Sequence, residues 1–447
     1  GVGGNIEDTE SDMYASYTPD SRTIGKNDIS SDYAILIDLE NNTVLASKKG
    51  DEKMYPASMT KMMTLIVAAE HAENLDDTFE MTTAITDPLF LENASVAGFL
   101  NGEQVTLRDL MYGLILPSGA DCAVALALYT AGSEAAFADM MNEKVAELGL
   151  KNTHFMNPNG LDADGHYTCA HDMAIITQAA NKYPAFAKYA GSVTYTLPAD
   201  NVIGEGWQIK TKVNALEQGS PVYDARIYAA KTGWTTKAHN TFIACAKTSD
   251  GSNMIVTLLN CPVKNGIFTE TTALLNYAES AYPKLTVPTD AFEKQAKKAV
   301  KKMGGKLDEA ELQAVTLRLP SSMTEKDLSY ACAQTPSGVQ MQISVAENSR
   351  KAYQEETGLD GSAPLATVML PVMDEKNEKQ EQAVQTQSES EKQGVVASMQ
   401  QKLSHLPKLA QDAILGASIV VCAIVLMFVI LFFIRLYHQR KKKQSRP

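Results

Sequence analysis

The chain has no excess of positive charge. Its 447 residues include 40 Lys and Arg against 53 Asp and Glu, which gives a formal net charge of −13. A protein that binds nucleic acid needs a basic face to neutralise phosphates, and no folded stretch of this sequence provides one. We therefore expect no nucleic acid among its partners.

Cysteines are also few. Only six are present, and Cys422 falls inside a long apolar run, which leaves an odd number elsewhere. The sequence has no CxxC pair and no cluster of His and Cys at zinc-ligand spacing. Most of the other cysteines have apolar neighbours, as in DCAVALAL and FIACAK, so we expect small buried thiols rather than a disulfide framework.

One long segment lacks charge altogether. Residues 413–434 read AILGASIVVCAIVLMFVILFFI, with Ser418 as the one conventional polar side chain. At about 1.5 Å per residue, a helix of this length crosses a bilayer core of roughly 30 Å. A basic segment follows at residues 435–447, and such segments stay in the cytoplasm. We therefore expect a single-pass helix in the cell membrane, an extracellular N-terminal part, and a cleaved signal peptide that precedes this numbering.

Strand and helix patterns begin near the N-terminus. Apolar runs at residues 33–39 and 43–48 flank ENN, which is a hairpin signal. Pro56 and Ser58 should then open a helix, with the serine as its cap, and another helix should begin near Ser118.

The later part of the main domain returns to strands. Strand patterns occupy residues 225–235, 241–248 and 253–260, and a helix pattern follows over residues 268–282. We expect one sheet completed by distant parts of the chain, with a helical subdomain inserted, which is an α+β fold. The loop at residues 157–172 is rich in Gly, Asn and Asp, and long ordered loops are often functional.

The chain is too long for a single core, which usually stops growing at about 250 to 300 residues. Beyond residue 284, short alternating segments predict a small β-rich domain, and a polar stretch then predicts a linker. We expect six segments: a flexible leader (1–23), a main domain (24–283), a β-rich domain (284–373), a polar linker (374–412), a transmembrane helix (413–434) and a basic cytoplasmic tail (435–447).

The stretch SMTK places a serine and a lysine one helical turn apart. Because residues three apart on a helix share a face, Lys61 can act as the base that makes Ser58 a nucleophile. Alone the pattern is weak, since a capped helix with an exposed lysine has the same sequence.

Two further motifs strengthen the catalytic interpretation. AKTGW places Lys231, Thr232, Gly233 and Trp234 on a predicted strand, and LILPSGADC places Ser118 at the mouth of a helix. SxxK followed by KTG is the signature set of penicillin-binding proteins and serine β-lactamases, and Ser118 stands where that family has its S-x-N serine.

Residues 24–283 resemble the low-molecular-weight penicillin-binding proteins, the D-alanyl-D-alanine carboxypeptidases. The blocks YPASMTKMMT, LMYGLILPSGADCA, NPNGLDADGHYTCAHDMA and AAKTGWTTKAHNTF are similar to that family's blocks. The segment after residue 284 resembles its C-terminal β domain. The resemblance implies a β-lactamase/transpeptidase-like sheet, no metal or other cofactor, peptidoglycan stem peptides ending in D-Ala-D-Ala as substrates, and acylation by β-lactams.

The resemblance also implies catalytic roles. Ser58 would attack the carbonyl of the penultimate D-alanine to form an acyl-enzyme, with Lys61 as its base and Ser118 as a proton relay to the leaving amine. A nearby Lys231 and the positive end of the helix would favour the neutral form of Lys61.

Substrate binding would fall to the KTG strand. Lys231 and Thr232 would hold the terminal carboxylate of the peptide. Gly233 would let the substrate backbone lie close, and the backbone N–H groups of Ser58 and Trp234 would form an oxyanion hole.

The sequence departs from the family at its second motif. Ala120 stands where that motif usually ends in asparagine, and Asp121 follows it. The missing amide would contact both Lys61 and the substrate, and Asn214, in TKVNAL, is a speculative substitute.

Three other functions stay open. A class A β-lactamase would deacylate with a loop glutamate, but the loop at residues 157–172 contains none, and Asp162 and Asp164 are the candidate substitutes. A non-catalytic penicillin-binding sensor would explain Ala120. A zinc carboxypeptidase would need a ligand motif such as HxH or HExxH, and none links His154, His166, His171 and His239.

Overall fold

A computed structural model describes residues 14–19 and 21–373. The predicted transmembrane helix, basic tail and polar linker, and most of the leader, lie outside these residues. Within the described part, no helix combines the length and apolar character needed to cross a membrane.

The main architectural element is a six-stranded sheet, antiparallel except for its first pair. Its strands come from both ends of the main domain because β2 pairs with β10 in antiparallel register, Leu36 opposite Val256. The predicted hairpin, the three late strands and their union in one sheet are therefore confirmed. In spatial order the strands are β1 (Arg22–Thr23), β3 (Thr43–Lys48), β2 (Tyr33–Asp38), β10 (Asn253–Cys261), β9 (His239–Lys247) and β8 (Ile227–Thr235).

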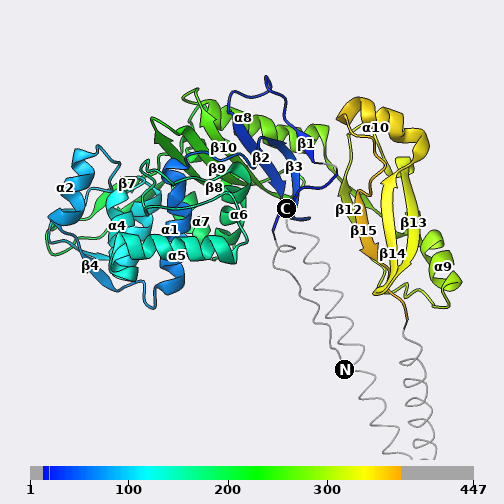
Figure 1. The fold of residues 1–447 in the computed structure, drawn as a ribbon, viewed down its shortest axis with the longest axis horizontal. Coiled ribbons are helices and arrows are strands. Elements are labelled where there is room, and N and C mark those ends of the chain that lie inside the picture. Colours follow the sequence, from blue (N-terminus) through cyan, green and yellow to red (C-terminus); the bar gives the residue numbers. More distant parts are fainter. Residues whose placement is uncertain (1–13, 20, 374–447) are drawn as a thin grey trace, which may run out of the picture. The chain divides into compact units, whose positions relative to one another are not determined.

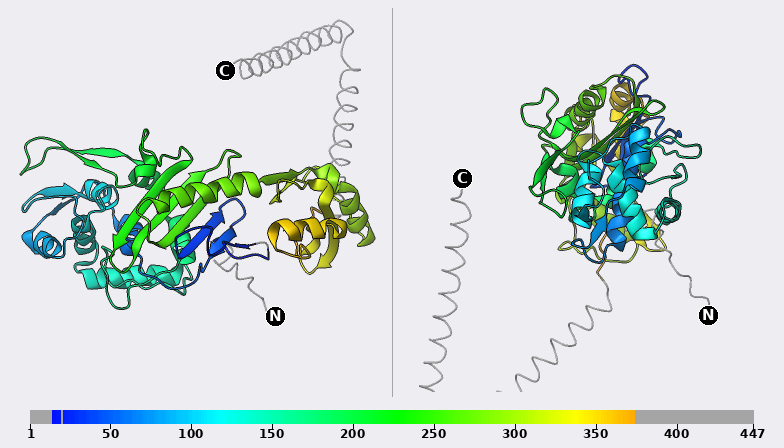
Figure 2. Two further views of the ribbon diagram at one scale, coloured as in Figure 1. Left: turned by 90° about the horizontal axis from the view of Figure 1, so that it is seen from above. Right: turned by 90° about the vertical axis from the view of Figure 1, so that its left-hand side faces the viewer.

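Both faces of the sheet are covered. Since strand side chains alternate between faces, Ile35 and Ile255 join the core beneath the helical subdomain. Leu36 and Val256 join the core beneath α8 (Gly266–Asn276). Figure 1 and Figure 2 show α8 lying along one face of the sheet. The fold is α+β, as predicted.

The helical subdomain holds more elements than the sequence predicted, including two short hairpins. Its helices are α1 (Thr60–His71), α2 (Thr83–Leu91), α3 (Leu107–Ile115), α4 (Ala120–Ala131), α5 (Glu134–Glu147), α6 (Ala170–Ala180) and α7 (Phe186–Gly191). Its hairpin strands are β4 (Thr78–Glu80) with β5 (Gln104–Thr106), and β6 (Thr194–Leu197) with β7 (Trp207–Lys210).

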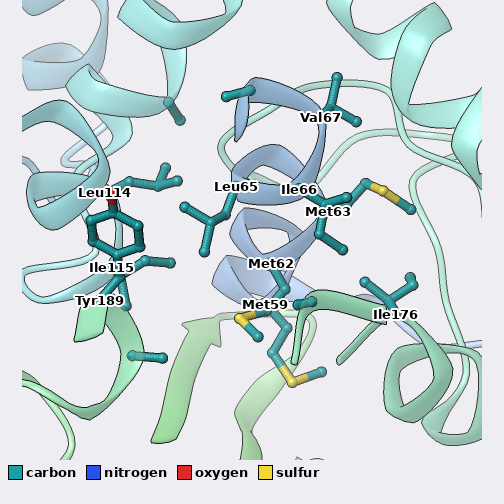
Figure 3. Packing of buried hydrophobic residues seen from close by; sticks show 14 of the residues in the cluster. Met59, Met62, Met63, Leu65, Ile66, Val67, Leu114, Ile115, Ile176 and Tyr189 are labelled. Atoms are coloured by element: carbon teal, nitrogen blue, oxygen red, sulfur yellow. The ribbon is translucent and has the colours of Figure 1, made fainter. Parts of the chain in front are cut away.

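The first helix, α1, is enclosed by the helices around it. Every residue from Thr60 to Ala68 is buried, and Figure 3 shows apolar side chains such as Leu114 and Ile176 around it. A helix that is apolar on all sides belongs in a core. Any charged group on its first turn is therefore withdrawn from water.

Residues beyond 283 form strands and helices of their own. The strands are β11 (Lys284–Val287) paired with β12 (Val315–Arg318), and a three-stranded sheet of β13 (Leu328–Thr335), β14 (Gly338–Val345) and β15 (Ala366–Met369). Two helices, α9 (Glu293–Lys302) and α10 (Arg350–Thr357), accompany them.

The chain divides into two compact units, residues 1–299 with 311–370 and residues 300–310 with 371–447. Within the second unit, the described residues include a bridge between Leu307 and Val372. A separate β-rich domain at residues 284–373 stays a prediction.

Candidate active site

Ser58 lies at a tight entry into α1. It belongs to the one-turn helix η2 (Ala57–Met59), where Ala57 has a φ of +52°, a value that non-glycine residues seldom adopt. No side chain caps α1, so the expectation that Ser58 is a helix cap was wrong. Its hydroxyl is engaged by Lys61 instead.

The Lys61 ammonium faces Ser58 directly. Its Nζ donates to Oγ of Ser58 at 2.8 Å and to the carbonyl oxygen of Asn159 at 2.6 Å. Burial and the charge of Lys212 lower the pKa of Lys61 to about 7, although Asp121 opposes this shift. The expected coupling of Lys61 with Lys231 is present, since the charge of Lys61 lowers the pKa of Lys231, and Lys212 is a further cation that the sequence did not predict.

Ser118 lies between helices α3 and α4, with a left-handed φ of +62° and a side chain that is only 3% exposed. Its Oγ accepts a hydrogen bond from Nζ of Lys231 at 2.9 Å, and the same ammonium donates to the carbonyl oxygen of Thr232 at 2.5 Å. Burial lowers the pKa of Lys231 well below its ordinary value, and the charges of Lys61 and Lys212 add to this.

Strand β8 brings the KTG residues against Ser58. A Cβ added at Gly233 would lie 2.8 Å from the backbone nitrogen of Ser58 and 2.4 Å from Oγ1 of Thr241. Such distances exclude a side chain, so glycine is required for this close approach. Trp234, the next residue, is 61% exposed beside the site.

These elements surround a pocket of about 380 Å³. Ser58, Ser118, Thr232, Gly233 and Trp234 line it, and no acidic side chain does. The structure therefore brings together all of the predicted site residues, because Lys61 and Lys231 bond to the lining serines.

The loop at residues 157–161 supports Lys61 from the other side. Besides the Asn159 carbonyl, the loop offers the Pro158 carbonyl, which accepts from Oγ1 of Thr64 at 2.6 Å. Gly160 packs so closely that an added Cβ would lie 2.0 Å from the Ala57 carbonyl oxygen. Sequence reasoning marked this loop as functional but missed the contact between Asn159 and Lys61.

In the second motif, LILPSGADC, the side-chain hydrogen bonds beyond Ser118 come from Asp121. Ala120 is buried and has no polar side chain, while the Asp121 carboxylate accepts from the backbone nitrogens of Ala97 at 2.8 Å and Gly98 at 3.1 Å. Asp121 therefore holds the loop at residues 95–98 in place.

Sequence reasoning missed several lining residues of the pocket, among them Lys212 and Ser95, and the proposed substitution of Asn214 for the missing amide stays a prediction. Nζ of Lys212 donates to Oγ of Ser95 at 2.6 Å, and both side chains line the pocket. Asn214, at the start of η3 (Asn214–Leu216), lines it too. No motif surrounds Lys212 or Ser95, so nothing in the sequence distinguished them from surface residues.

Asp162 and His166, weighed above for other functions, have structural partners. Asp162 accepts a hydrogen bond from Oγ1 of Thr235 at 2.8 Å, which ties the loop to β8. His166 contacts Oγ1 of Thr60 and accepts from the Met156 backbone, and burial lowers its pKa to about 4. The described residues include no group of three or more His, Cys, Asp or Glu that could hold a metal.

Cysteines in the described part are free thiols, as expected. Cys122, Cys169, Cys245 and Cys261 are buried, and Cys332 is partly exposed.

Known proteins are similar to this chain in sequence and in fold. Residues 20–262 match the model of the peptidase S11 family, D-alanyl-D-alanine carboxypeptidase. The D-alanyl-D-alanine carboxypeptidase DacF of Bacillus subtilis is 34% identical over 254 residues, which cover 56% of this chain and 62% of the relative. The D-alanyl-D-alanine carboxypeptidase DacA of Escherichia coli is 44% identical over 152 residues, which cover 32% of this chain and 38% of the relative.

A solved structure is similar as well. The Streptomyces K15 DD-transpeptidase matches with a TM-score of 0.53 and 28% identity, covering 57% of this chain and 98% of that one. This chain spans less than two thirds of the length of either DacF or DacA.

Proposed function

Since the chain belongs to the peptidase S11 family of D-alanyl-D-alanine carboxypeptidases, we propose that it is a serine D,D-carboxypeptidase. It removes the terminal D-alanine from peptidoglycan stem peptides and is acylated by β-lactams at Ser58. The reaction needs no cofactor, because the nucleophile, the base and the oxyanion donors are all protein groups.

The observation that carries this proposal is the contact between Lys61 and Ser58. The two side-chain atoms are 2.8 Å apart, within the range for proton transfer. A lysine with a pKa of about 7 is substantially neutral at neutral pH and can accept a proton. An ordinary surface lysine cannot do so, which separates this arrangement from a capped helix.

Acylation joins the substrate to Ser58 and releases the terminal D-alanine. Oγ of Ser58 bonds to the penultimate D-alanine carbonyl carbon while its proton passes to Nζ of Lys61. The bond from that carbon to the nitrogen of the terminal D-alanine breaks, and the departing amine takes a proton relayed by the Ser118 hydroxyl. Backbone N–H groups of Ser58 and Trp234 stabilise the oxyanion, and one such donor is typically worth about 3 kcal/mol.

The substrate lies along β8. This strand forms one edge of the six-stranded sheet, so an extended peptide can pair with it, and Gly233 leaves room for the peptide backbone. Lys231 and Thr232 bind the terminal carboxylate of the substrate. The absence of acidic side chains from the pocket lining favours this anion.

Water completes the reaction by hydrolysing the ester at Ser58. A second candidate function, D,D-transpeptidation, uses the same acyl-enzyme and differs only in the acceptor, an amine in place of water. The similarity to the Streptomyces DD-transpeptidase favours it. Adding glycylglycine to the reaction tests it, because a transpeptidase forms a new peptide product and a carboxypeptidase does not.

Release of D-alanine from diacetyl-L-Lys-D-Ala-D-Ala tests the main proposal. We expect steady release by the wild type, none by Ser58→Ala, and little from the same peptide with an amidated C-terminus, because the carboxylate contact is lost. Labelling by fluorescent penicillin without any D-alanine release would instead support a sensor module.

A β-lactamase is the less favoured outcome. The Asp162 carboxylate accepts a hydrogen bond from Thr235, and the loop has no glutamate to activate water. The penicillin adduct should therefore persist for many minutes. Rapid loss of the adduct with accumulation of penicilloic acid would favour the β-lactamase.

We further propose how the catalytic part is attached. Residues 24–283 form the catalytic domain and residues 284–373 a small β-rich domain. The apolar residues 413–434 anchor both outside the cell membrane, with residues 435–447 in the cytoplasm. The pairing of β13, β14 and β15 in a sheet of their own supports the second domain, and sequence alone supports the anchor. Protease treatment of intact spheroplasts should remove penicillin binding if this orientation is right.

A further inference from the structure

Lys212 has no role in the mechanism above, yet it contacts the site at several points. We propose that Lys212 is a positioning residue for the reaction: it braces the turn that carries Ser118, and its charge acts across the pocket on Lys61. This inference rests on the proposed carboxypeptidase function and assigns Lys212 a part in it.

The bracing consists of three hydrogen bonds that enclose the Ser118 turn. The backbone nitrogen of Lys212 donates to the carbonyl oxygen of Leu116 at 3.1 Å, just before the turn. Just after the turn, the nitrogen of Ala120 donates to the carbonyl oxygen of Ser95 at 2.7 Å. Nζ of Lys212 donates to Oγ of the same Ser95 at 2.6 Å, which joins the two sides.

The turn needs such support because of its conformation. Ser118 has a φ of +62°, in the left-handed region that non-glycine residues avoid. Strained residues of this kind persist when the surrounding structure fixes them. Ala120 offers no side-chain hydrogen bond, so the contacts from Lys212 and Ser95 brace the turn together with the bond from Lys231 to Ser118.

The charge of Lys212 acts on both buried lysines. After burial, its charge is the largest cause of the lowered pKa of Lys61. It also contributes to the lowered pKa of Lys231. Three other ionisable groups lie around Lys61. Asp121 and Cys122 on α4 favour its charged form, whereas Lys231 on β8 is a second ammonium group coupled to it. Lys212, which lines the pocket, counteracts the Asp121 carboxylate.

The direction of the effect follows from this arrangement. Removing the Lys212 charge raises the pKa of Lys61, so the base stays protonated to a higher pH. The acidic limb of kcat/KM should therefore move to higher pH, whereas a purely structural loss would lower the rate without moving the limb.

Three variants separate the charge from the hydrogen bond. In Lys212→Gln we expect kcat/KM for D-alanine release to fall about tenfold at pH 7 and the acidic limb to rise by about half a pH unit or more. Lys212→Arg keeps the positive charge, so the acidic limb of kcat/KM should lie at the same pH as in the wild type. Ser95→Ala removes the Nζ partner and should lower kcat without moving the limb.

The pH dependence of Ser58 acylation by benzylpenicillin gives a second readout that needs no turnover. A Lys212→Gln variant whose limb matches the wild type in both assays, whatever its rate, would overturn the inference. Failure of the wild type to release D-alanine would instead count against the proposed function, while the acylation profiles would still test Lys212. Unchanged thermal melting of the variants confirms that they fold.

Discussion

At the scale of single residues, the charge state of Lys61 sets the pH range of the proposed reaction. The folded pKa of about 7 means that the base is protonated, and therefore inactive, at lower pH. We predict that the rate of Ser58 acylation falls as pH drops below about 7, roughly tenfold per unit once the group is fully protonated. Stopped-flow acylation by a chromogenic β-lactam between pH 5.5 and 8.5 measures this. A rate that stays level over that range would remove Lys61 as the base.

The sequence identified the residues whose partners are close along the chain or belong to a motif. Ser58 and Lys61 are three residues apart, and the KTG triplet has a recognisable spacing from them. Asn159 and Lys212 act through a backbone carbonyl and an isolated ammonium. Such contacts leave no pattern in residue types, so only the fold reveals them.

At the scale of elements, the loop at residues 157–172 contacts η2 through Gly160. An added Cβ at Gly160 would lie 2.0 Å from the Ala57 carbonyl and 3.1 Å from the Ser58 Cα, and its φ is +88°. We predict that Gly160→Ala lowers the acylation rate about 100-fold, since a displacement of about 1 Å costs this much.

Gly165→Ala is the matched control for that change. Gly165 has a φ of +85° in the same loop, but its nearest neighbour is the flexible Met156 side chain at 3.4 Å. It should lose stability while keeping its acylation rate. Equal rate losses in the two variants would show that backbone strain, rather than contact with η2, is responsible.

Elements differ in how well the sequence predicts them. The long strands of the sheet were found because their runs are apolar and β-branched, and turn residues such as SDGS separate two of them. Helix α2 was missed because it is short and contains Pro88, and β13 because its residues are largely exposed. The role of Ser58 as a cap was wrong because its hydroxyl contacts Nζ of Lys61, three residues on, and no backbone N–H of the helix.

At the scale of the whole molecule, one buried ion pair joins segments that are far apart in sequence. Nε of Arg318 on β12 donates to Asp38 on β2 at 2.8 Å, with side chains only 4% and 2% exposed. The same guanidinium donates to the carbonyl oxygens of Ala278 and Tyr282. It therefore ties the first strands of the main domain to the strand pair at residues 284–318.

We predict that Arg318→Met lowers the free energy of unfolding by about 3–5 kcal/mol, because the buried Asp38 carboxylate loses its cation and keeps only the backbone N–H of Glu40. The exposed pair of Arg108 with Asp76, 43% and 70% exposed, supplies a control. Arg108→Met should cost about 0–1 kcal/mol. Urea unfolding of both variants measures the difference, and similar losses in the two would contradict the structural role of the buried pair.

The central claim is that one serine hydroxyl, activated by a lysine in the same helical turn, takes up the acyl group. Intact mass spectrometry after incubation with benzylpenicillin tests it, with peptide mapping to find the modified residue. We expect an adduct of one penicillin per chain on the peptide that contains Ser58, and no adduct on Ser58→Ala. An adduct of the same mass on the Ser58→Ala protein, or one mapped to another residue of the wild type, would contradict it.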